Sequence, residues 1–330
     1  MFEPATFSDL PAFLCGHAQN TEAATGCTAI VAPKGAVCSV DVRGGGPATR
    51  ETDLLRPENT IENVHAVVLS GGSAFGLAAS TGVMEELASR SIGFELCGQH
   101  VPIVTGACLF DLVIGSSEYP TAEMGAQAVR NAFEAGSNAN PEEGNVGAGC
   151  GATVGKFLQP QQAMKTGFGV YGLRCGGVVA VALVAVNALG TVCDSTGTPL
   201  AGCLDEETGK IMEPLEPLYR LAQAATQNAL EPQEGPCPNT TIGAIVTNAN
   251  ITKAQAKKIS SIAHDAYARA IKPVHSSADS DTIFTMASGE AEAPFDLVAV
   301  LATEAMQKAV ERAATEATSS HGYLAHSDIR

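Results

Sequence analysis

Residues 235–246, Gly235-Pro236-Cys237-Pro238-Asn239-Thr240-Thr241-Ile242-Gly243-Ala244-Ile245-Val246, change from loop to strand midway. The prolines and the glycine predict a loop that ends at Asn239, and the apolar residues from Ile242 onward predict a buried strand. Thr240 and Thr241 stand at the junction, where threonine is common because it favours extended backbone. The alternative is that the chain is cut here, so that one threonine becomes a new N-terminus and a nucleophile.

The segments around this strand predict a mixture of helices and strands. Some predicted strands follow one another directly along the chain. This order favours stacked sheets with helices outside, an α/β fold of the α+β type, over a doubly wound parallel sheet. The predicted strands are 64–69, 172–188 (one or two strands), 242–247 and 282–287; the predicted helices are 74–90, 218–230, a helix from the capping box of Thr252 and Gln255 to Pro273, and 296–314; 231–239 is a loop and 319–330 a loose tail.

The composition supports a large buried core and argues against two kinds of partner. Of 330 residues, 45% are apolar and 16% are charged, which suits one large domain or two ordinary ones. The net charge of −16 repels phosphate backbones and anionic lipid headgroups, so neither nucleic acid nor a membrane is an expected partner. The longest uncharged apolar run, 175–192, contains Asn187, and its unbroken part is too short to cross a bilayer.

The N-terminus and the cysteines indicate a cytoplasmic protein. Residues 1–19 lack the basic start and the apolar centre of a signal peptide. Ten cysteines are scattered without a Cys-x-x-Cys pair, and several lie in apolar or glycine-rich segments. This pattern favours small buried thiols in a reducing compartment over disulfides or a zinc site.

The glycine-rich motifs do not meet the requirements of cofactor sites. Residues 147–152 match a loose dinucleotide pattern, but the polar residues before them do not predict the strand that such a site needs. Lys156 ends a stretch like a phosphate-binding loop, in which the required first glycine and the final hydroxyl residue are replaced. The histidines form no zinc motif, and His264 and His275 are expected mainly to pack or to cap. No cofactor or metal is therefore predicted.

Four polar residues stand out because they lie among glycine, alanine and apolar residues. Lys156 closes a glycine-rich segment, Asn187 interrupts an apolar strand, and Asp279 and Asp281 flank a serine just before a strand. Each has an ordinary explanation as a solvated tip or a turn residue. Asn187 is the most demanding of the four, because a buried amide needs hydrogen-bond partners.

Five stretches can be taken together: 42–53 (VRGGGPATRETD), 69–77 (LSGGSAFGL), 144–156 (GNVGAGCGATVGK), 238–243 (PNTTIG) and 263–271 (AHDAYARAI). In these stretches the chain resembles the DmpA-type aminopeptidase family, which also holds β-aminopeptidases and nylon-oligomer hydrolases. The match runs from about residue 21 to residue 290, and its long motifs keep their order along the chain.

The resemblance implies a fold and a maturation step. The fold is a single domain over residues 1–330, a four-layer αββα sandwich of the DmpA/ornithine-acetyltransferase type. Members of the family are made as one inactive chain that cuts itself once. Here the cut would fall between Asn239 and Thr240, leaving an α-chain of residues 1–239 and a β-chain of residues 240–330 that begins with the nucleophile Thr240. The resemblance also implies a homo-oligomer, often a tetramer, without metal or cofactor.

The resemblance further implies a role for each of the four polar residues. In the nylon-hydrolase branch, Lys156 would lie beside the nucleophile and Asn187 would help to hold the oxyanion. Asp279 and Asp281 would orient the new amine and hydroxyl, and this pair matches that branch, whereas some β-aminopeptidases have Ser and Glu there. A tyrosine assists the oxyanion in some members, but the nearest stretch here offers only Phe110.

These residue types suit an amidohydrolase that forms an acyl-enzyme on threonine. A threonine hydroxyl is a weak nucleophile, and after cleavage the new α-amine of Thr240, with an ordinary pKa near 7.7–8.0, can serve as its base. Lys156 would hold the pKa of that amine down. The predicted function is hydrolysis of small peptides, amino-acid amides or esters. An acyl-transferase and a non-catalytic, uncut protein are the alternatives, and α-, β-, D- and ω-amino-acid substrates all stay open.

Overall fold

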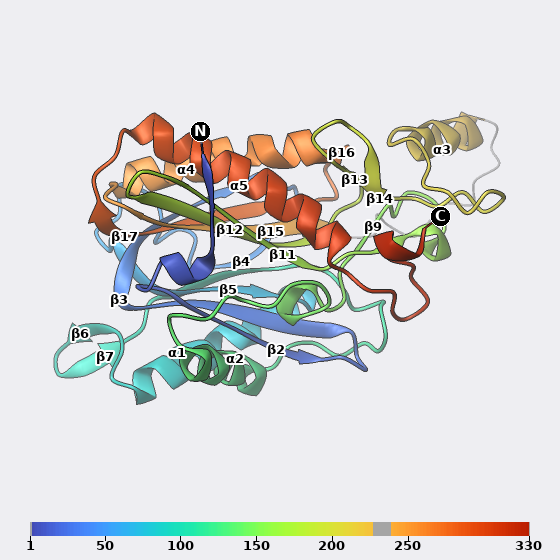
Figure 1. Cartoon of the computed structure of the whole chain (residues 1–330). Coiled ribbons are helices and arrows are strands. Elements are labelled where there is room, and N and C mark those ends of the chain that lie inside the picture. The colour runs from blue at the N-terminus through green and yellow to red at the C-terminus, as the bar shows by residue number, and fades with distance from the viewer. Residues whose placement is uncertain (1, 227–238, 330) are drawn as a thin grey trace.

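Four layers stack in the order helix, sheet, sheet, helix (Figure 1). The computed structural model describes residues 2–226 and 239–329. The predicted four-layer αββα sandwich is confirmed by this arrangement. The outer layers are pairs of helices, α4 (Lys253–Ala270) with α5 (Phe295–Thr315) at the top of Figure 1 and α1 (Ala78–Ser89) with α2 (Ala122–Ala135) at the bottom.

The inner layers are two groups of strands. The upper group is mostly antiparallel, and its one parallel pair joins the fourth and fifth strands named below. The upper strands are β1 (Glu3–Ala5), β11 (Phe168–Cys175), β12 (Val178–Asn187), β15 (Thr240–Ala249) and β17 (Thr282–Ala291); the lower strands are β2 (Leu14–Asn20), β5 (Asn63–Ser70), β8 (Val104–Cys108) and β4 (Ala48–Arg50).

One long strand, β3 (Thr25–Val42), belongs to both layers. Its first half pairs with β2 and β5 in the lower layer, and residues 37–42 pair with β17 in the upper layer. A register shift between Val31 and Ala36 separates the two halves. The strands therefore form one hydrogen-bonded sheet that folds over itself at β3.

Three hydrophobic cores fill the spaces between the four layers. The strand β12 lies between two of these cores, which explains why its sequence is apolar throughout. Alternate residues of β12 such as Ala182 and Val184 pack against α4 and α5, whereas Val181 and Leu183 pack between the two sheet layers. Because successive side chains of a strand point to opposite faces, a strand covered on both sides needs apolar residues at every position. The third core lies between the lower sheet layer and α1 and α2.

Most of the predicted elements are present, and three of the strands are longer than predicted. The strands predicted at 64–69, 242–247 and 282–287 are β5, β15 and β17, and the run 172–188 contains the end of β11 and all of β12. The capping box of Thr252 and Gln255 starts α4 as predicted. The helix predicted at 74–90 begins as a 3-10 turn, η2 (Ser73–Leu77), before α1. The helix predicted at 218–230 is α3 (Glu216–Thr226).

Part of that last prediction, residues 227–230, and the predicted loop up to residue 238 lie outside the described residues. Within the described residues, no helix is both long and apolar enough to cross a bilayer. Nine cysteines are described, all as free thiols, and seven of them are buried. The remaining short elements are η1 (Phe7–Asp9), β6 (Phe94–Leu96), β7 (Gln99–Val101), η3 (Gly147–Gly149), β9 (Thr153–Val154), η4 (Pro160–Gln162), β10 (Met164–Lys165), β13 (Thr191–Cys193), β14 (Pro199–Ala201), β16 (Ile271–Lys272) and η5 (His326–Asp328).

The prediction of a loose C-terminal tail was wrong. The carbonyl of Leu324 accepts a hydrogen bond of 2.8 Å from the backbone N–H of Lys165. Ala325 is fully buried, and the ring of His326 is hydrogen-bonded to the carbonyl of Leu200 at 2.7 Å. The polar, short-chain composition of the tail hid these contacts, because they are made largely by the backbone of its partners and need no apolar periodicity.

Two histidines, the half-buried His17 and the buried His264, make stability depend on pH. Burial lowers the pKa of His17 to about 4 and that of His264 to about 4, from an ordinary 6.5. The unfolded chain therefore binds protons more readily between pH 6.5 and 4, so stability falls as the pH drops through this range. Burial raises the pKa of Asp111 to about 6, which acts in the opposite direction.

We expect the free energy of unfolding to fall on going from pH 7 to pH 5, by about 2 kcal/mol per histidine, less about 1 kcal/mol from Asp111. Denaturant unfolding at the two pH values measures this difference. His17→Asn removes the ring that must stay neutral, and we expect a shallower pH dependence in this variant. An equal pH dependence in both proteins would contradict the assignment to His17.

Candidate active site

Thr240 is the first residue of β15 and is buried at the junction predicted from the sequence. Across the upper sheet layer it pairs with Asn187, the last residue of β12. On the other side of β15, Ile242 pairs in parallel with Thr282 at the start of β17. The starts of β15 and β17 and the end of β12 therefore meet at one edge of the sheet, and this edge carries the predicted site.

The peptide carbonyl of Asn239 receives two hydrogen bonds. The hydroxyl of Thr240 donates to its oxygen at 2.6 Å, and the backbone N–H of Ser280 donates at 2.9 Å. The N–H of Asn239 in turn donates to the carbonyl of Ala278, and Asn239 forms a parallel bridge with Asp279. The peptide bond that was predicted to break, between Asn239 and Thr240, therefore has its carbonyl oxygen bonded both to the Thr240 hydroxyl and to the backbone N–H of Ser280.

The side chain of Asn187 is held on all sides. Its Oδ1 accepts from the N–H of Thr153 at 3.1 Å and from Nζ of Lys156 at 2.9 Å. Its Nδ2 donates to the carbonyl of Phe110 at 2.8 Å. An amide nitrogen carries two N–H groups, so the bond to Phe110 uses one of them and leaves a second donor on the same atom. The buried amide noted in the sequence therefore has the partners that it needs.

Lys156 follows the glycine-rich segment and turns its ammonium group toward Asn187. Nζ donates to both the backbone oxygen and Oδ1 of Asn187, each at 2.9 Å. The backbone N–H of Lys156 donates to the carbonyl of Leu189, so this loop follows the chain that leaves β12. Burial raises the pKa of Asp279 overall, and the positive charge of Lys156 acts against this shift by favouring the ionised carboxylate. Lys156 thus connects Asn187 with the acidic side of the site.

Asp279 is a buried carboxyl group with a raised pKa. Burial is the main cause, and the negative charge of Asp281 adds to it. A hydrogen bond of 2.5 Å from the N–H of Ser276 and the charge of Lys156 act in the opposite direction. A carboxylate with a raised pKa is a better proton acceptor than an ordinary one, which suits a general base.

Asp281 makes its contacts with the neighbours of Thr240. One carboxylate oxygen accepts from the backbone N–H of Thr241 at 2.7 Å, and the other accepts from the ring of His275 at 2.8 Å. Asp281 stands directly before β17, so its side chain links the starts of two neighbouring strands. Asp281 thus holds Thr241, the residue that follows Thr240.

The glycine run after β3 exists because the loop before β17 lies against it. A Cβ on Gly44 would lie 2.3 Å from Cα of Ser280 and 2.4 Å from the carbonyl oxygen of Asp279, closer than side chains allow. The N–H of Gly46 donates to that same carbonyl at 3.2 Å. Glycine is required here so that the backbone of one loop can pack directly against the other.

Two buried charged residues that support the site, Asp111 and Lys165, were missed from the sequence. Asp111 follows Phe110 and accepts from the N–H of Gly72 at 2.7 Å and from the hydroxyl of Thr25 at 2.8 Å. These bonds fix the backbone beside Phe110, whose carbonyl accepts the hydrogen bond from Asn187. The one signal in the sequence was that Asp111 directly follows Phe110, which lies in the stretch where some members of the family have an oxyanion tyrosine.

Lys165 is fully buried and donates to the carbonyls of Gly149, Ala152 and Thr166. Burial lowers its pKa to about 7. Three acceptors match the three N–H groups of an ammonium, so the hydrogen bonds favour the charged form. Ala152 precedes Thr153, which donates to Asn187, and Lys165 therefore fixes the glycine-rich loop on that side. No pattern in the sequence distinguishes a buried lysine from a solvated one.

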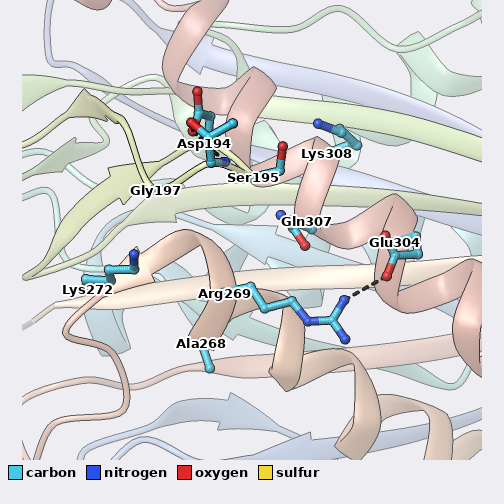
Figure 2. A pocket seen from close by; sticks show the side chains of 10 residues that line it. Asp194, Ser195, Gly197, Ala268, Arg269, Lys272, Glu304, Gln307 and Lys308 are labelled. Carbon is cyan, nitrogen blue, oxygen red and sulfur yellow. Dashed lines mark hydrogen bonds and ion pairs between the residues drawn. The ribbon is translucent and has the colours of Figure 1, made fainter.

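The predicted residues Thr240, Asn187, Lys156, Asp279 and Asp281 thus gather at one edge of the upper sheet layer. A separate cavity of about 500 Å³ lies between the end of α4, α5 and the turn from β13 to β14, and holds none of these five residues (Figure 2). Arg269 and Glu304 form an ion pair of 2.7 Å in its wall. The described residues contain no cluster of His, Cys, Asp or Glu that could hold a metal ion.

Comparison with known proteins gives matches over most of the chain. The sequence profile of Peptidase family S58 matches residues 6–324. An uncharacterized aminopeptidase of Mycobacterium leprae is 40% identical over 276 residues, which cover 82% of this chain and 72% of that protein. A 6-aminohexanoate-oligomer endohydrolase of Paenarthrobacter ureafaciens is 30% identical over 290 residues, which cover 87% of this chain and 76% of that protein.

Solved structures with little sequence identity share the fold. A Burkholderia beta-aminopeptidase matches with a TM-score of 0.67 at 17% identity, over 98% of this chain and 91% of that one. The L-aminopeptidase D-Ala-esterase/amidase from Ochrobactrum anthropi, described as a variant of the Ntn hydrolase fold, matches with a TM-score of 0.66 at 15% identity, over 94% of this chain and 86% of that one.

Proposed function

The chain belongs to Peptidase family S58, a family of aminopeptidases and amidohydrolases that act on amide bonds, and from this premise we propose that it cuts itself between Asn239 and Thr240 and then uses Thr240 as the nucleophile. The observation that carries the proposal is the pair of hydrogen bonds on the Asn239 carbonyl, from the Thr240 hydroxyl at 2.6 Å and from the Ser280 N–H at 2.9 Å.

The first cut needs only parts of this chain and water. Oγ of Thr240 attacks the carbonyl carbon of Asn239, and the N–H of Ser280 stabilises the negative charge that develops on the carbonyl oxygen. The hydroxyl proton passes to a base, for which Asp279 is suited by its raised pKa, and then to the leaving nitrogen of Thr240. The C–N bond breaks to give an ester, and water hydrolyses the ester into chains 1–239 and 240–330.

Turnover of substrate repeats the same attack with a new base. The freed α-amine of Thr240 accepts the hydroxyl proton, and the positive charge of Lys156 favours the neutral form of that amine. The tetrahedral oxyanion of the substrate is stabilised by the remaining N–H of Asn187 Nδ2. The amine product leaves with the proton, and water then releases the acyl group from Thr240.

The substrates that we propose are small peptides, amino-acid amides and esters. The 6-aminohexanoate-oligomer endohydrolase acts, by its name, on an oligomer of an ω-amino acid. The name of the beta-aminopeptidase refers to β-amino acids. We therefore include ω- and β-amino-acid amides beside those of α-amino acids. Transfer of the acyl group to an amine instead of water is the second reaction that an acyl-enzyme allows.

We expect the purified protein to consist of chains 1–239 and 240–330 and to hydrolyse a subset of α-, β-, D- and ω-amino-acid p-nitroanilides. Intact mass spectrometry identifies the new terminus, because the Thr240 cut has a defined mass. An assay with and without an added amino-acid acceptor separates hydrolysis from acyl transfer, and light scattering on the same sample tests a homo-oligomeric state. An uncut and inactive protein would contradict the proposal and leave a non-catalytic protein of the same fold.

A further inference from the structure

His275 occupies a strained position next to the site. Its backbone φ is 59°, in the left-handed region, which few residues other than glycine adopt. Histidine, asparagine and aspartate tolerate this region better than most side chains. A strained backbone persists only where the surrounding structure fixes it, and such positions gather at functional sites. The left-handed backbone of His275 therefore indicates a role in the neighbouring site.

The conformation directs two donors of His275 at one oxygen of Asp281. Nδ1 of the ring lies 2.8 Å from Oδ2, and the backbone N–H of His275 lies 3.3 Å from the same atom. An ionised carboxylate only accepts hydrogen bonds, so Nδ1 carries the proton. The other oxygen, Oδ1, accepts from the N–H of Thr241 at 2.7 Å. With both oxygens occupied, the carboxylate cannot rotate without breaking a hydrogen bond.

The ring of His275 is itself fixed by its neighbours on α4. Its centroid lies 4.8 Å from that of His264 and 6.3 Å from that of Tyr267. His264 is anchored by a hydrogen bond of 3.1 Å from its ring to the carbonyl of Asp41 on β3. A continuous series of contacts therefore leads from α4 through His275 and Asp281 to Thr241, the residue next to the nucleophile.

We propose that His275 is a positioning residue, which fixes Asp281 and through it the backbone of Thr241, and so aims the hydroxyl of Thr240. This inference rests on the proposed function, because it assigns His275 to the reaction of Thr240. His275 touches neither Thr240 nor the Asn239 carbonyl in the hydrogen bonds described above, so it acts through Asp281. The part of His275 that matters is the Nδ1–H donor in the left-handed backbone.

Three variants separate the donor from the backbone. His275→Asn tolerates the left-handed region and places an amide N–H donor near the position of Nδ1. His275→Asp has the same size as His275→Asn and the same tolerance for the left-handed region, but its carboxylate offers only hydrogen-bond acceptors beside Asp281. His275→Gly accepts the backbone conformation and has no side-chain donor. The rate of self-cleavage and, for cut protein, kcat and KM are measured for each, with thermal unfolding as the check on folding.

We expect His275→Asn to stay within about threefold of the natural chain, and His275→Gly and His275→Asp to lose roughly 10- to 100-fold in cleavage rate and kcat with little change in KM. Similar rates for His275→Asn and His275→Gly, or an equal loss in His275→Asn and His275→Asp, overturn the inference. If the natural chain is cut and only the variants disagree, His275 alone is misassigned. If the natural chain is never cut, the proposed function fails and this inference fails with it.

Discussion

Thr240→Ala is expected to give a folded chain of 330 residues that is never cut and has almost no activity on amides. The variant removes the oxygen that lies 2.6 Å from the Asn239 carbonyl oxygen and that, in the function we propose, forms both the ester of the first cut and the acyl-enzyme. Without cleavage the nitrogen of residue 240 also remains an amide and cannot act as a base. Removing nucleophile and base together should lower kcat by about 10,000-fold or more.

Intact mass spectrometry and a p-nitroanilide assay measure the two effects on one sample. Thr240 is buried at the start of β15, so Thr240→Val serves as the control for shape, because it keeps the branched side chain and lacks the hydroxyl. Thr240→Ser keeps the hydroxyl and should still be cut, with a lower rate because serine holds its χ1 less firmly. Two chains from the alanine or the valine variant would refute the assignment of Thr240.

Strands could be predicted where consecutive residues carry the signal for the strand. The loop-to-strand junction at Thr240 and the doubly buried run of β12 carry their signals in consecutive residues. The crossing of β3 between the sheet layers does not, because Pro33 and Gly35 lie within it and such residues usually indicate a turn. The strand continues there because its pairing with β5 resumes after a register shift, at Ala36 and Val37, where its pairing with β17 also begins.

The site residues divide in a similar way. Lys156, Asn187, Asp279 and Asp281 could be chosen from the sequence because each is a polar residue in an apolar or glycine-rich setting and because the chain resembles a known family. The contact of Asp281 with His275 depends on one left-handed backbone angle, which periodicity does not encode. Two of the three carbonyls around Lys165 belong to the glycine-rich loop, at Gly149 and Ala152, and the third belongs to the adjacent Thr166. No periodic pattern in the sequence marks this return of Lys165 onto the loop.

Asn187→Asp is expected to lower kcat by roughly 1,000-fold with a small change in KM. The carboxylate has nearly the same shape and can still accept from the N–H of Thr153 and from Nζ of Lys156, which lie 3.1 and 2.9 Å from Oδ1. It cannot donate, so the bond to the Phe110 carbonyl is lost, and a negative charge replaces the donor that we propose for the oxyanion. The loss should therefore appear in the chemical step.

Turnover must be scored per cut chain, because the same substitution also slows the first cut if Asn187 affects the edge on which Thr240 lies. Intact mass gives the cut fraction after prolonged incubation, and kcat is divided by it. Asn187→Ala is the control: it removes the donor without adding a charge, leaves the Phe110 carbonyl and Lys156 without this partner, and should lose roughly 100-fold. If Asn187→Asp turned over at the natural rate, the oxyanion would have to be held by other donors, and the backbone N–H of Ser280, already bonded to the Asn239 carbonyl, would be the first to test.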